Sequence, residues 1–306
     1  MLKPKALAKE STIGIFAPAS PVEQEKLSQG VSFLNSLGYR TKVSGQALSR
    51  YHYFAGSHEV RAAELNRLFA DPEVDAIFCA RGGYGCVHLL PFLDSGIICA
   101  NPKVFLGYSD VTVLLQYLEI QAEMVCFHGP MVAREFCLPT STAIAQTLFD
   151  CLSRRTAGLK IGGLSLETLI AGTARGKLTG GCLSLIIAML STRYEINTAG
   201  KILFLEDINI KPYQFDRMLM QLKLAGKFDQ VRGVVFGEMQ NCSQDSDDPY
   251  SLQQIIMDLL AEFRIPILYG LPSGHTRSSN LTLPIGVEVT LDGDNQWLLL
   301  EESAVA

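Results

Sequence analysis

The feature that most constrains the fold is an alternation of short apolar runs with helical patterns along the first half of the chain. The runs at Thr12–Ala17, Val74–Ala80 and Val104–Leu106 are mostly apolar and show little polar alternation, which is typical of strands buried on both faces. Amphipathic stretches, such as Gln24–Leu37 and Ser57–Phe69, separate them. Strands that alternate with helices of about ten to fifteen residues predict a parallel sheet with helices on both faces.

The character of the chain changes after a last helix predicted over Ser141–Arg154. The next stretch, 155–179, is rich in glycine and threonine, and we interpret it as a linker with one short strand at Leu159–Ile161. Further on, the sequence predicts a buried helix, strands at Lys201–Glu206, Val231–Gly237 and Ile265–Leu271, and short antiparallel strands at the end of the chain. The prediction is an α/β protein with two domains: an N-terminal parallel sheet flanked by helices (1–154) and a smaller mixed α/β domain (180–306).

Composition excludes several classes of partner. The formal net charge is −5, with lysines and arginines scattered along the chain, so nothing favours nucleic acid. No apolar run reaches the roughly 18 residues of a membrane span, and the amino terminus lacks the apolar core of a signal peptide. Eight cysteines without a C-x-x-C pair are expected to be buried, reduced thiols. We therefore expect a cytoplasmic protein with no membrane or nucleic-acid partner.

A serine turn follows one of the predicted strands. The apolar run Val104–Leu106 leads into Gly107-Tyr108-Ser109-Asp110, and a helical pattern follows. A strand, a tight turn and a helix raise one side chain to the edge of a sheet and leave backbone N–H groups free to meet a negative charge. Ser109 is therefore a candidate nucleophile. The alternative is that Ser109 or Asp110 only caps the helix, and Val111 stands where the full glycine elbow has a second glycine.

A glycine loop, Gly82-Gly83-Tyr84-Gly85, follows the strand before it. Both loops are expected at the carboxyl ends of parallel strands, where open α/β sheets bind ligands. The glycine spacing fits neither a dinucleotide fingerprint nor a P-loop. We interpret the loop as the source of one oxyanion donor, the Gly83 N–H, beside the Asp110 N–H; the alternative is a tight turn into a helix.

A serine nucleophile needs a base and a group that orients the base. Among the five histidines, at 52, 58, 88, 128 and 275, His275 lies in a loop rich in glycine and proline after a predicted strand, and His128 ends another strand. Glu206 ends the strand Lys201–Glu206 and supplies a carboxylate to orient a histidine. For Glu206 and His275, a purely structural role is the alternative.

Motifs along nearly the whole chain resemble the LD-carboxypeptidase family of serine peptidases. They are Ala80-Arg81-Gly82-Gly83-Tyr84-Gly85, Gly107-Tyr108-Ser109-Asp110, His128-Gly129-Pro130, Gly180-Gly181, Phe204-Leu205-Glu206-Asp207, Asp216-Arg217-Met218-Leu219 and Gly274-His275. The resemblance implies a catalytic triad of Ser109, Glu206 and His275, divided between the domains, and an oxyanion hole formed by the backbone of Gly83 and Asp110. It also implies a cytoplasmic homodimer that uses no metal and no cofactor.

The resemblance further implies a substrate. Members of the family remove the terminal D-alanine from murein tetrapeptide during cell-wall recycling, and a sister group inactivates peptide-nucleotide antibiotics such as microcin C. That group carries an extra tryptophan-bearing loop in the second domain, whereas this chain has one tryptophan, Trp297, among its last predicted strands. Arg81 is a candidate for binding the substrate carboxylate, with a structural ion pair as the alternative. A non-catalytic α/β module that binds a small anion, and a general esterase, remain alternatives.

Overall fold

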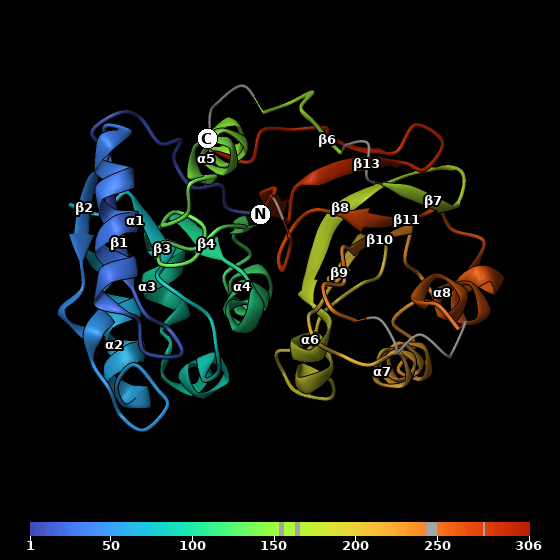
Figure 1. Ribbon diagram of the computed structural model, residues 1–306, viewed down its shortest axis with the longest axis horizontal. Helices are drawn as coiled ribbons and strands as arrows, with labels where there is room; N and C mark the ends of the chain where they lie inside the picture. The colour runs from blue at the N-terminus through green and yellow to red at the C-terminus, as the bar shows by residue number, and fades with distance from the viewer. Residues whose placement is uncertain (153–155, 163–165, 243–249, 278) are drawn as a thin grey trace.

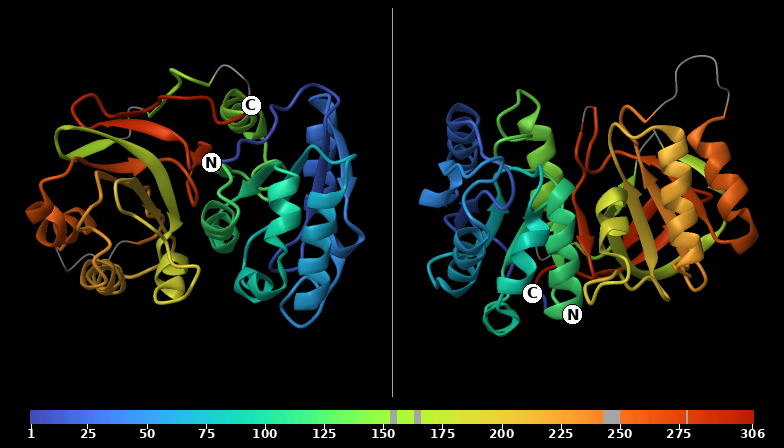
Figure 2. Two further views of the ribbon diagram at one scale, coloured as in Figure 1. Left: turned by 180° about the vertical axis from the view of Figure 1, so that it is seen from behind. Right: turned by 90° about the horizontal axis from the view of Figure 1, so that it is seen from below.

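Two β-sheets organise the chain, one in each half of the molecule (Figure 1). The computed structural model describes residues 1–152, 156–162, 166–242, 250–277 and 279–306. Figure 2 shows that the two halves lie side by side, with helices around each sheet. In the described part of the chain, every helix is too short or too polar to cross a membrane.

The first sheet has the strand order β12-β5-β4-β3-β1-β2. Its strands are β1 (Thr12–Phe16), β2 (Arg40–Val43), β3 (Ala76–Cys79), β4 (Val104–Gly107), β5 (Cys126–His128) and β12 (Leu283–Ile285). The first five run parallel, while β12 joins β5 in the antiparallel direction. A segment from near the end of the chain therefore completes the N-terminal sheet.

Successive residues of the central strands point to opposite faces of this sheet, and both faces are covered. Ile77 packs with the buried side chains of α2 (His58–Ala70), α3 (Ser95–Ala100) and α4 (Thr112–Gln121). Phe78 packs on the other face, with α1 (Gln24–Ser36) and α5 (Ser141–Cys151). The predicted parallel sheet with helices on both faces is confirmed.

The second sheet is mixed, with the order β6-β14-β13-β8-β9-β10-β11-β7. Its strands are β6 (Lys160–Gly162), β7 (Glu167–Ile170), β8 (Thr173–Cys182), β9 (Ile202–Glu206), β10 (Gly233–Gly237), β11 (Ile267–Leu271), β13 (Glu288–Asp292) and β14 (Trp297–Leu300). Strands β8 to β11 are parallel, and the others are antiparallel to their neighbours. Three helices, α6 (Leu183–Met189), α7 (Pro212–Leu224) and α8 (Leu252–Leu260), bury their apolar sides against one face. The mixed α/β architecture predicted for the second half is confirmed.

The stretch 155–179 has more regular structure than the sequence suggested. The single strand expected at Leu159–Ile161 corresponds to β6, but β7 and most of β8 also lie in this range. The described residues of this stretch are thus largely part of the second sheet, because β7 pairs with β11 and β8 pairs with β9 and β13. The division into 1–154, 155–179 and 180–306 stays a prediction.

The two halves share a core and polar contacts. Leu114 and Leu115 of α4 belong to the same buried cluster as Phe204 and Leu268 of the second sheet. The Thr112 hydroxyl at the start of α4 accepts a hydrogen bond from Cys182 N at 3.0 Å. Figure 1 shows α4 and α6 facing one another at this junction. The serine turn at the start of α4 is therefore held against the second half.

Candidate active site

The serine turn sits where β4 ends. The short 3-10 helix η3 (Ser109–Val111) begins immediately after Tyr108 and continues into α4. Ser109 has a φ of +65°, a left-handed conformation that costs a non-glycine residue about 1–3 kcal/mol and is concentrated at functional sites. A Cβ on Gly107 would lie 2.8 Å from Val111 Cγ1, so the tight turn requires a glycine there.

The glycine loop lies directly against this turn. A Cβ on Gly82 would lie 3.3 Å from the Ser109 hydroxyl oxygen, and a Cβ on Gly83 would lie 2.2 Å from the hydroxyl oxygen of Ser20. Gly83 has a φ of +117°, and its N–H donates to none of the described residues. A free N–H beside a serine hydroxyl is what an oxyanion donor requires.

Two buried charged side chains connect these loops. The Asp110 carboxylate accepts a hydrogen bond from Cys86 N at 2.8 Å, which ties the serine turn to the end of the glycine loop. Burial raises the pKa of Asp110, although the hydrogen bond from Cys86 and the nearby Arg61 oppose this. Arg61 of α2 is fully buried, and its guanidinium donates to the carbonyls of Gly85, at 3.0 Å, and Pro18.

The sequence interpretation missed Arg61. Its signal was an arginine on the otherwise apolar side of α2, beside Ala62 and Leu65. Such an arginine must satisfy its donors inside the protein.

Glu206 and His275 form a buried pair. Glu206 ends β9, and one of its oxygens, Oε2, lies 2.8 Å from His275 Nδ1 and also accepts the His275 backbone N–H at 2.9 Å. A Cβ on Gly274 would lie 2.5 Å from the Glu206 carboxyl carbon, so the loop before His275 approaches the carboxylate closely. The contact at Nδ1 leaves Nε2 of His275 as the nitrogen available to a nucleophile.

Each member of this pair shifts the pKa of the other. Burial by itself raises the pKa of Glu206, but the charge and hydrogen bond of His275, together with the nearby His128, outweigh it and lower the pKa to about 2. Burial lowers the pKa of His275, but the charge and hydrogen bond of Glu206 and the charge of Asp207 raise it above its ordinary value. The two shifts agree: the site favours a carboxylate beside a histidine that gains a proton readily.

A second histidine faces the other oxygen of Glu206. His128 is fully buried, and its Nε2 lies 3.7 Å from Glu206 Oε1. Its Nδ1 lies 3.3 Å from the Ser273 hydroxyl, which donates to the carbonyl of Leu281. Among the described residues, neither His128 Nε2 nor Glu206 Oε1 has a partner within hydrogen-bond distance. His128 therefore belongs to the same buried group as the pair.

Tyr108 connects the serine turn with the pair. Its ring packs edge-on against His275, with ring centroids 5.0 Å apart, and its hydroxyl donates to Glu135 Oε1 at 2.7 Å. The residue next to Ser109 thus contacts the predicted base. The structure joins Glu206 to His275 directly, and joins the Ser109 turn to His275 through Tyr108 and to Gly83 through the glycine loop.

The other histidines and Arg81 have different surroundings. The rings of His58 and His88 stack 4.2 Å apart beside Phe54. The Arg81 guanidinium donates to the Pro21 carbonyl at 3.1 Å, a contact that favours the structural alternative. Among the described residues, no three histidine, cysteine or acidic side chains are grouped as metal ligands.

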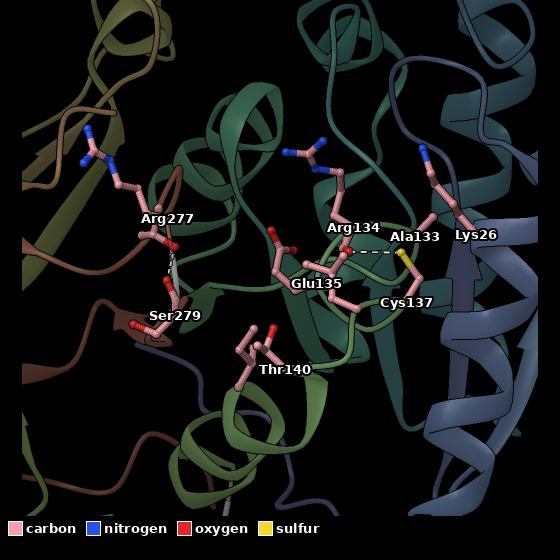
Figure 3. Close-up of a pocket in the computed structure, with 11 residues that line it drawn as sticks. Lys26, Ala133, Arg134, Glu135, Cys137, Thr140, Arg277 and Ser279 are labelled. Carbon is pink, nitrogen blue, oxygen red and sulfur yellow. Dashed lines mark hydrogen bonds between the residues drawn. The ribbon is translucent and has the colours of Figure 1, made fainter. Parts of the chain in front are cut away.

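A pocket opens beside the pair, between the two halves. It has a volume of about 260 Å³ and is lined by Lys26, by the segment that follows β5, and by Thr276, Arg277 and Ser279. In Figure 3, the side chains of Lys26, Arg134 and Arg277 extend to the same side of the pocket, with Glu135 between the two arginines. One of its lining residues, Thr276, directly follows His275, and three of the others are the cations Lys26, Arg134 and Arg277.

Family models match both halves of the chain. Residues 13–129 match the LD-carboxypeptidase N-terminal domain, and residues 175–291 match the LD-carboxypeptidase C-terminal domain. A probable murein peptide carboxypeptidase from Bacillus subtilis (strain 168) is 38% identical over 302 residues, which cover 98% of this chain and 94% of that protein.

Solved structures resemble the whole chain. MccF in complex with glutamyl sulfamoyl guanosine has a TM-score of 0.93 at 25% identity, with both chains fully covered. A muramoyltetrapeptide carboxypeptidase from Oxalobacter formigenes has a TM-score of 0.85 at 28% identity, covering 95% of this chain and 98% of that one. The similarity therefore extends across both sheets and the junction between them.

Proposed function

The chain belongs to the LD-carboxypeptidase family, and we propose that it is a serine carboxypeptidase that releases the terminal D-alanine from murein tetrapeptide in cell-wall recycling. The observation that carries the proposal is the buried Glu206–His275 pair, joined through Tyr108 to the turn that presents Ser109. A carboxylate that holds an imidazole, with a serine turn packed beside that imidazole, is an arrangement that supports acyl transfer.

In the proposed mechanism, Glu206 holds the His275 ring through Nδ1 and stabilises the imidazolium that forms. His275 takes the proton from the Ser109 hydroxyl as Ser109 attacks the carbonyl before the terminal residue. His275 then protonates the amine of the departing D-alanine, and an acyl-enzyme remains. Water, activated by the same histidine, hydrolyses this ester and restores Ser109.

The tetrahedral intermediate carries a negative charge on the former carbonyl oxygen. The backbone N–H groups of Gly83 and Asp110 are the proposed donors to it. Gly83 supports this role because its N–H is free and its loop contacts Ser109. The Asp110 carboxylate already accepts a hydrogen bond from Cys86 N. The backbone N–H of Asp110 is therefore the group that we assign to the oxyanion hole. A preorganised pair of donors is worth several kcal/mol to such a transition state.

The choice of substrate rests on the relatives. The Bacillus subtilis protein, named a probable murein peptide carboxypeptidase, shares 38% identity with this chain, whereas the microcin C7 self-immunity protein MccF of Escherichia coli shares 29%. Trp297 pairs within the sheet of β13 and β14 and lies under Lys160, with the ammonium 4.6 Å from the ring centroid. It is thus engaged within the second sheet, which supports murein peptide over a nucleotide-linked peptide.

Hydrolysis of a peptide-nucleotide antibiotic is the second candidate, because the TM-score of 0.93 to MccF covers the whole chain. The two candidates share the bond-breaking residues and differ in what lies before the scissile bond. A cytoplasmic homodimer is part of the first proposal, and size-exclusion chromatography with light scattering tests the dimer.

Product analysis tests the proposed function. The protein is incubated with murein tetrapeptide, with a microcin C-type peptide-nucleotide and with a simple aryl ester, and the products are identified by mass spectrometry. Release of D-alanine from the tetrapeptide alone supports the proposal. Cleavage of only the peptide-nucleotide supports the second candidate, and cleavage of only the ester supports a general esterase. No cleavage of any of the three supports a non-catalytic anion-binding module.

A further inference from the structure

The pocket beside His275 has the size of one end of a peptide. Its volume of about 260 Å³ lies just below the roughly 300–1,000 Å³ of pockets that enclose a whole drug-sized ligand. The walls come from both halves of the molecule, since Arg134 follows β5 and Thr276 follows His275. A substrate whose scissile bond lies at Ser109 therefore has room here for a short terminal group.

The positive charges of this pocket outnumber its negative charges. Its one acidic side chain, Glu135, already accepts hydrogen bonds from the Tyr108 hydroxyl and, at 2.8 Å, from Met131 N. Among the described residues, neither Arg134 nor Arg277 forms an ion pair with a carboxylate. Lys26 does, with Glu23 at 2.8 Å on the surface of α1. The guanidinium group of Arg134 is thus available to an anion.

Among the cations of this pocket, Arg134 interacts electrostatically with His275 and Tyr108. Its charge lowers the pKa of His275, in the same direction as burial and against the larger effect of Glu206. Tyr108 in turn raises the pKa of Arg134 through its charge and a hydrogen bond. Tyr108 precedes Ser109 in the chain, and His275 packs against Tyr108. The turn that carries Arg134 is held by Arg134 N, which donates to the Met131 carbonyl at 3.2 Å.

We infer that Arg134 binds the free terminal carboxylate of the substrate and so makes this enzyme cleave only the last residue of a peptide. This inference rests on the proposed carboxypeptidase function. A terminal carboxylate lies one residue beyond the scissile carbonyl, within about 3.8 Å per residue of chain, so its partner must adjoin the nucleophile and base. The planar fork of an arginine matches a carboxylate with two parallel hydrogen bonds.

The other cations fit this role less well. Arg81 donates to the Pro21 carbonyl at 3.1 Å and does not line the pocket. Lys26 already pairs with Glu23. Arg277 lies on the opposite wall, on the loop after Thr276, as Figure 3 shows, and is exposed like Arg134. Arg277 therefore provides a matched control, with the same charge in the same pocket.

The test compares two substrates that differ only at the terminal group. Murein tetrapeptide is offered with its free carboxylate or as the C-terminal amide, to the wild type and to the Arg134→Gln, Arg134→Lys and Arg277→Gln variants. Values of kcat/KM are measured on the high-pH plateau, because loss of the Arg134 charge also raises the pKa of His275. Thermal unfolding of each variant is recorded alongside.

The wild type is expected to prefer the acid over the amide by about 10- to 100-fold, the value of a hydrogen-bonded charge contact. Arg134→Gln should lose this preference, because kcat/KM falls for the acid substrate and not for the amide. Arg134→Lys should keep part of the preference. Arg277→Gln should retain the wild-type ratio of the two kcat/KM values. An unchanged ratio in both Arg134 variants, or an equal loss in Arg277→Gln, overturns the inference. If the proposed function itself fails, the wild type releases neither D-alanine from the acid nor D-alaninamide from the amide, which is a different result.

Discussion

One oxygen of Glu206 binds His275 twice, through the ring nitrogen Nδ1 at 2.8 Å and through the backbone N–H at 2.9 Å. The backbone contact fixes where the carboxylate lies relative to the loop, and the ring contact fixes how the imidazole is turned. The ring is therefore oriented only while the loop around Gly274 packs against Glu206. The approach is close, since a Cβ on Gly274 would lie 2.5 Å from the carboxyl carbon of Glu206. Glu206 and His275 therefore form one structural unit.

Replacement of Glu206 with Gln tests this unit. The amide keeps the shape but removes the charge that holds the histidine in the productive tautomer, so kcat should fall by about 10⁴-fold. The pH profile should change as well. His275 must be neutral to accept a proton, and its pKa is raised above the ordinary value, so wild-type activity should be lost as the pH falls through a value above 6.5.

In Glu206→Gln, burial becomes the dominant influence on His275 and lowers its pKa, so the acid limb of kcat/KM should move to lower pH. Steady-state kinetics between pH 5 and 9 measure both effects. An acid limb that stays at the wild-type pH in the variant would show that another group than His275 is being titrated.

The conformation of Ser109 allows stability and activity to be separated. Its φ of +65° is unfavourable for any residue with a Cβ, by about 1–3 kcal/mol. Ser109→Gly should relieve this strain and, after the entropy gained by the unfolded chain, stabilise the protein by about 0.5–1 kcal/mol. Ser109→Ala should give no such gain, and both variants should lose about 10⁶-fold in kcat.

Urea unfolding and D-alanine release measure the two quantities on the same preparations. If Ser109→Gly were no more stable than Ser109→Ala, the turn would not be strained in the way its backbone indicates. If Ser109→Ala still hydrolysed the tetrapeptide, Ser109 would not be the nucleophile.

Much of the first half of the fold could be predicted because its pattern is local. The strand expected at Val104–Leu106 and the helix at Gln24–Leu37 agree with β4 and α1 within a residue, since buried parallel strands and amphipathic helices leave clear periodicities in the sequence. In contrast, β7 and β8 were not predicted. Strand β7 has only four residues and β8 is rich in glycine, and both have pairing partners far away in the chain.

The candidate site divides in the same way. Ser109, Gly83, Glu206 and His275 carry local signals, because each ends a strand or lies in a glycine-rich loop. Their partners do not. The contact of Glu206 with Gly274, like the burial of Arg61 under the glycine loop, depends on segments that meet only in three dimensions. The role of Arg134 is of this kind as well, since no motif marks it.

The glycine loop gives a prediction about transition-state stabilisation. Gly83→Ala places a Cβ 2.2 Å from the hydroxyl oxygen of Ser20 at a φ of +117°, so the loop must move and its N–H with it. Loss of one oxyanion donor should lower kcat by about 10²–10³-fold while KM changes little. Gly45→Ala is the control, because a Cβ there meets nothing within 4 Å. Equal kcat in both variants would remove Gly83 from the proposed oxyanion hole.

A partly buried ion pair that joins the two halves gives the last prediction. Glu119 of α4 is almost fully buried; one carboxylate oxygen lies 2.5 Å from Lys201 Nζ and the other accepts the Thr179 hydroxyl at 2.6 Å. Glu119→Gln leaves Lys201 without its counter-charge, so the free energy of unfolding should fall by about 3 kcal/mol.

The exposed pair of Lys223 and Glu262, 2.7 Å apart, is the matched control, and Glu262→Gln should cost under about 1 kcal/mol. Urea unfolding of both variants measures the difference. Because Thr179 leads into Gly181, which packs on Thr112 at the start of α4, Glu119→Gln should also loosen the junction that positions Ser109. Glu119→Gln should therefore lower kcat at temperatures where the protein remains folded, whereas Glu262→Gln should not. A Glu119→Gln variant as stable and active as Glu262→Gln would show that the halves are held together without this pair.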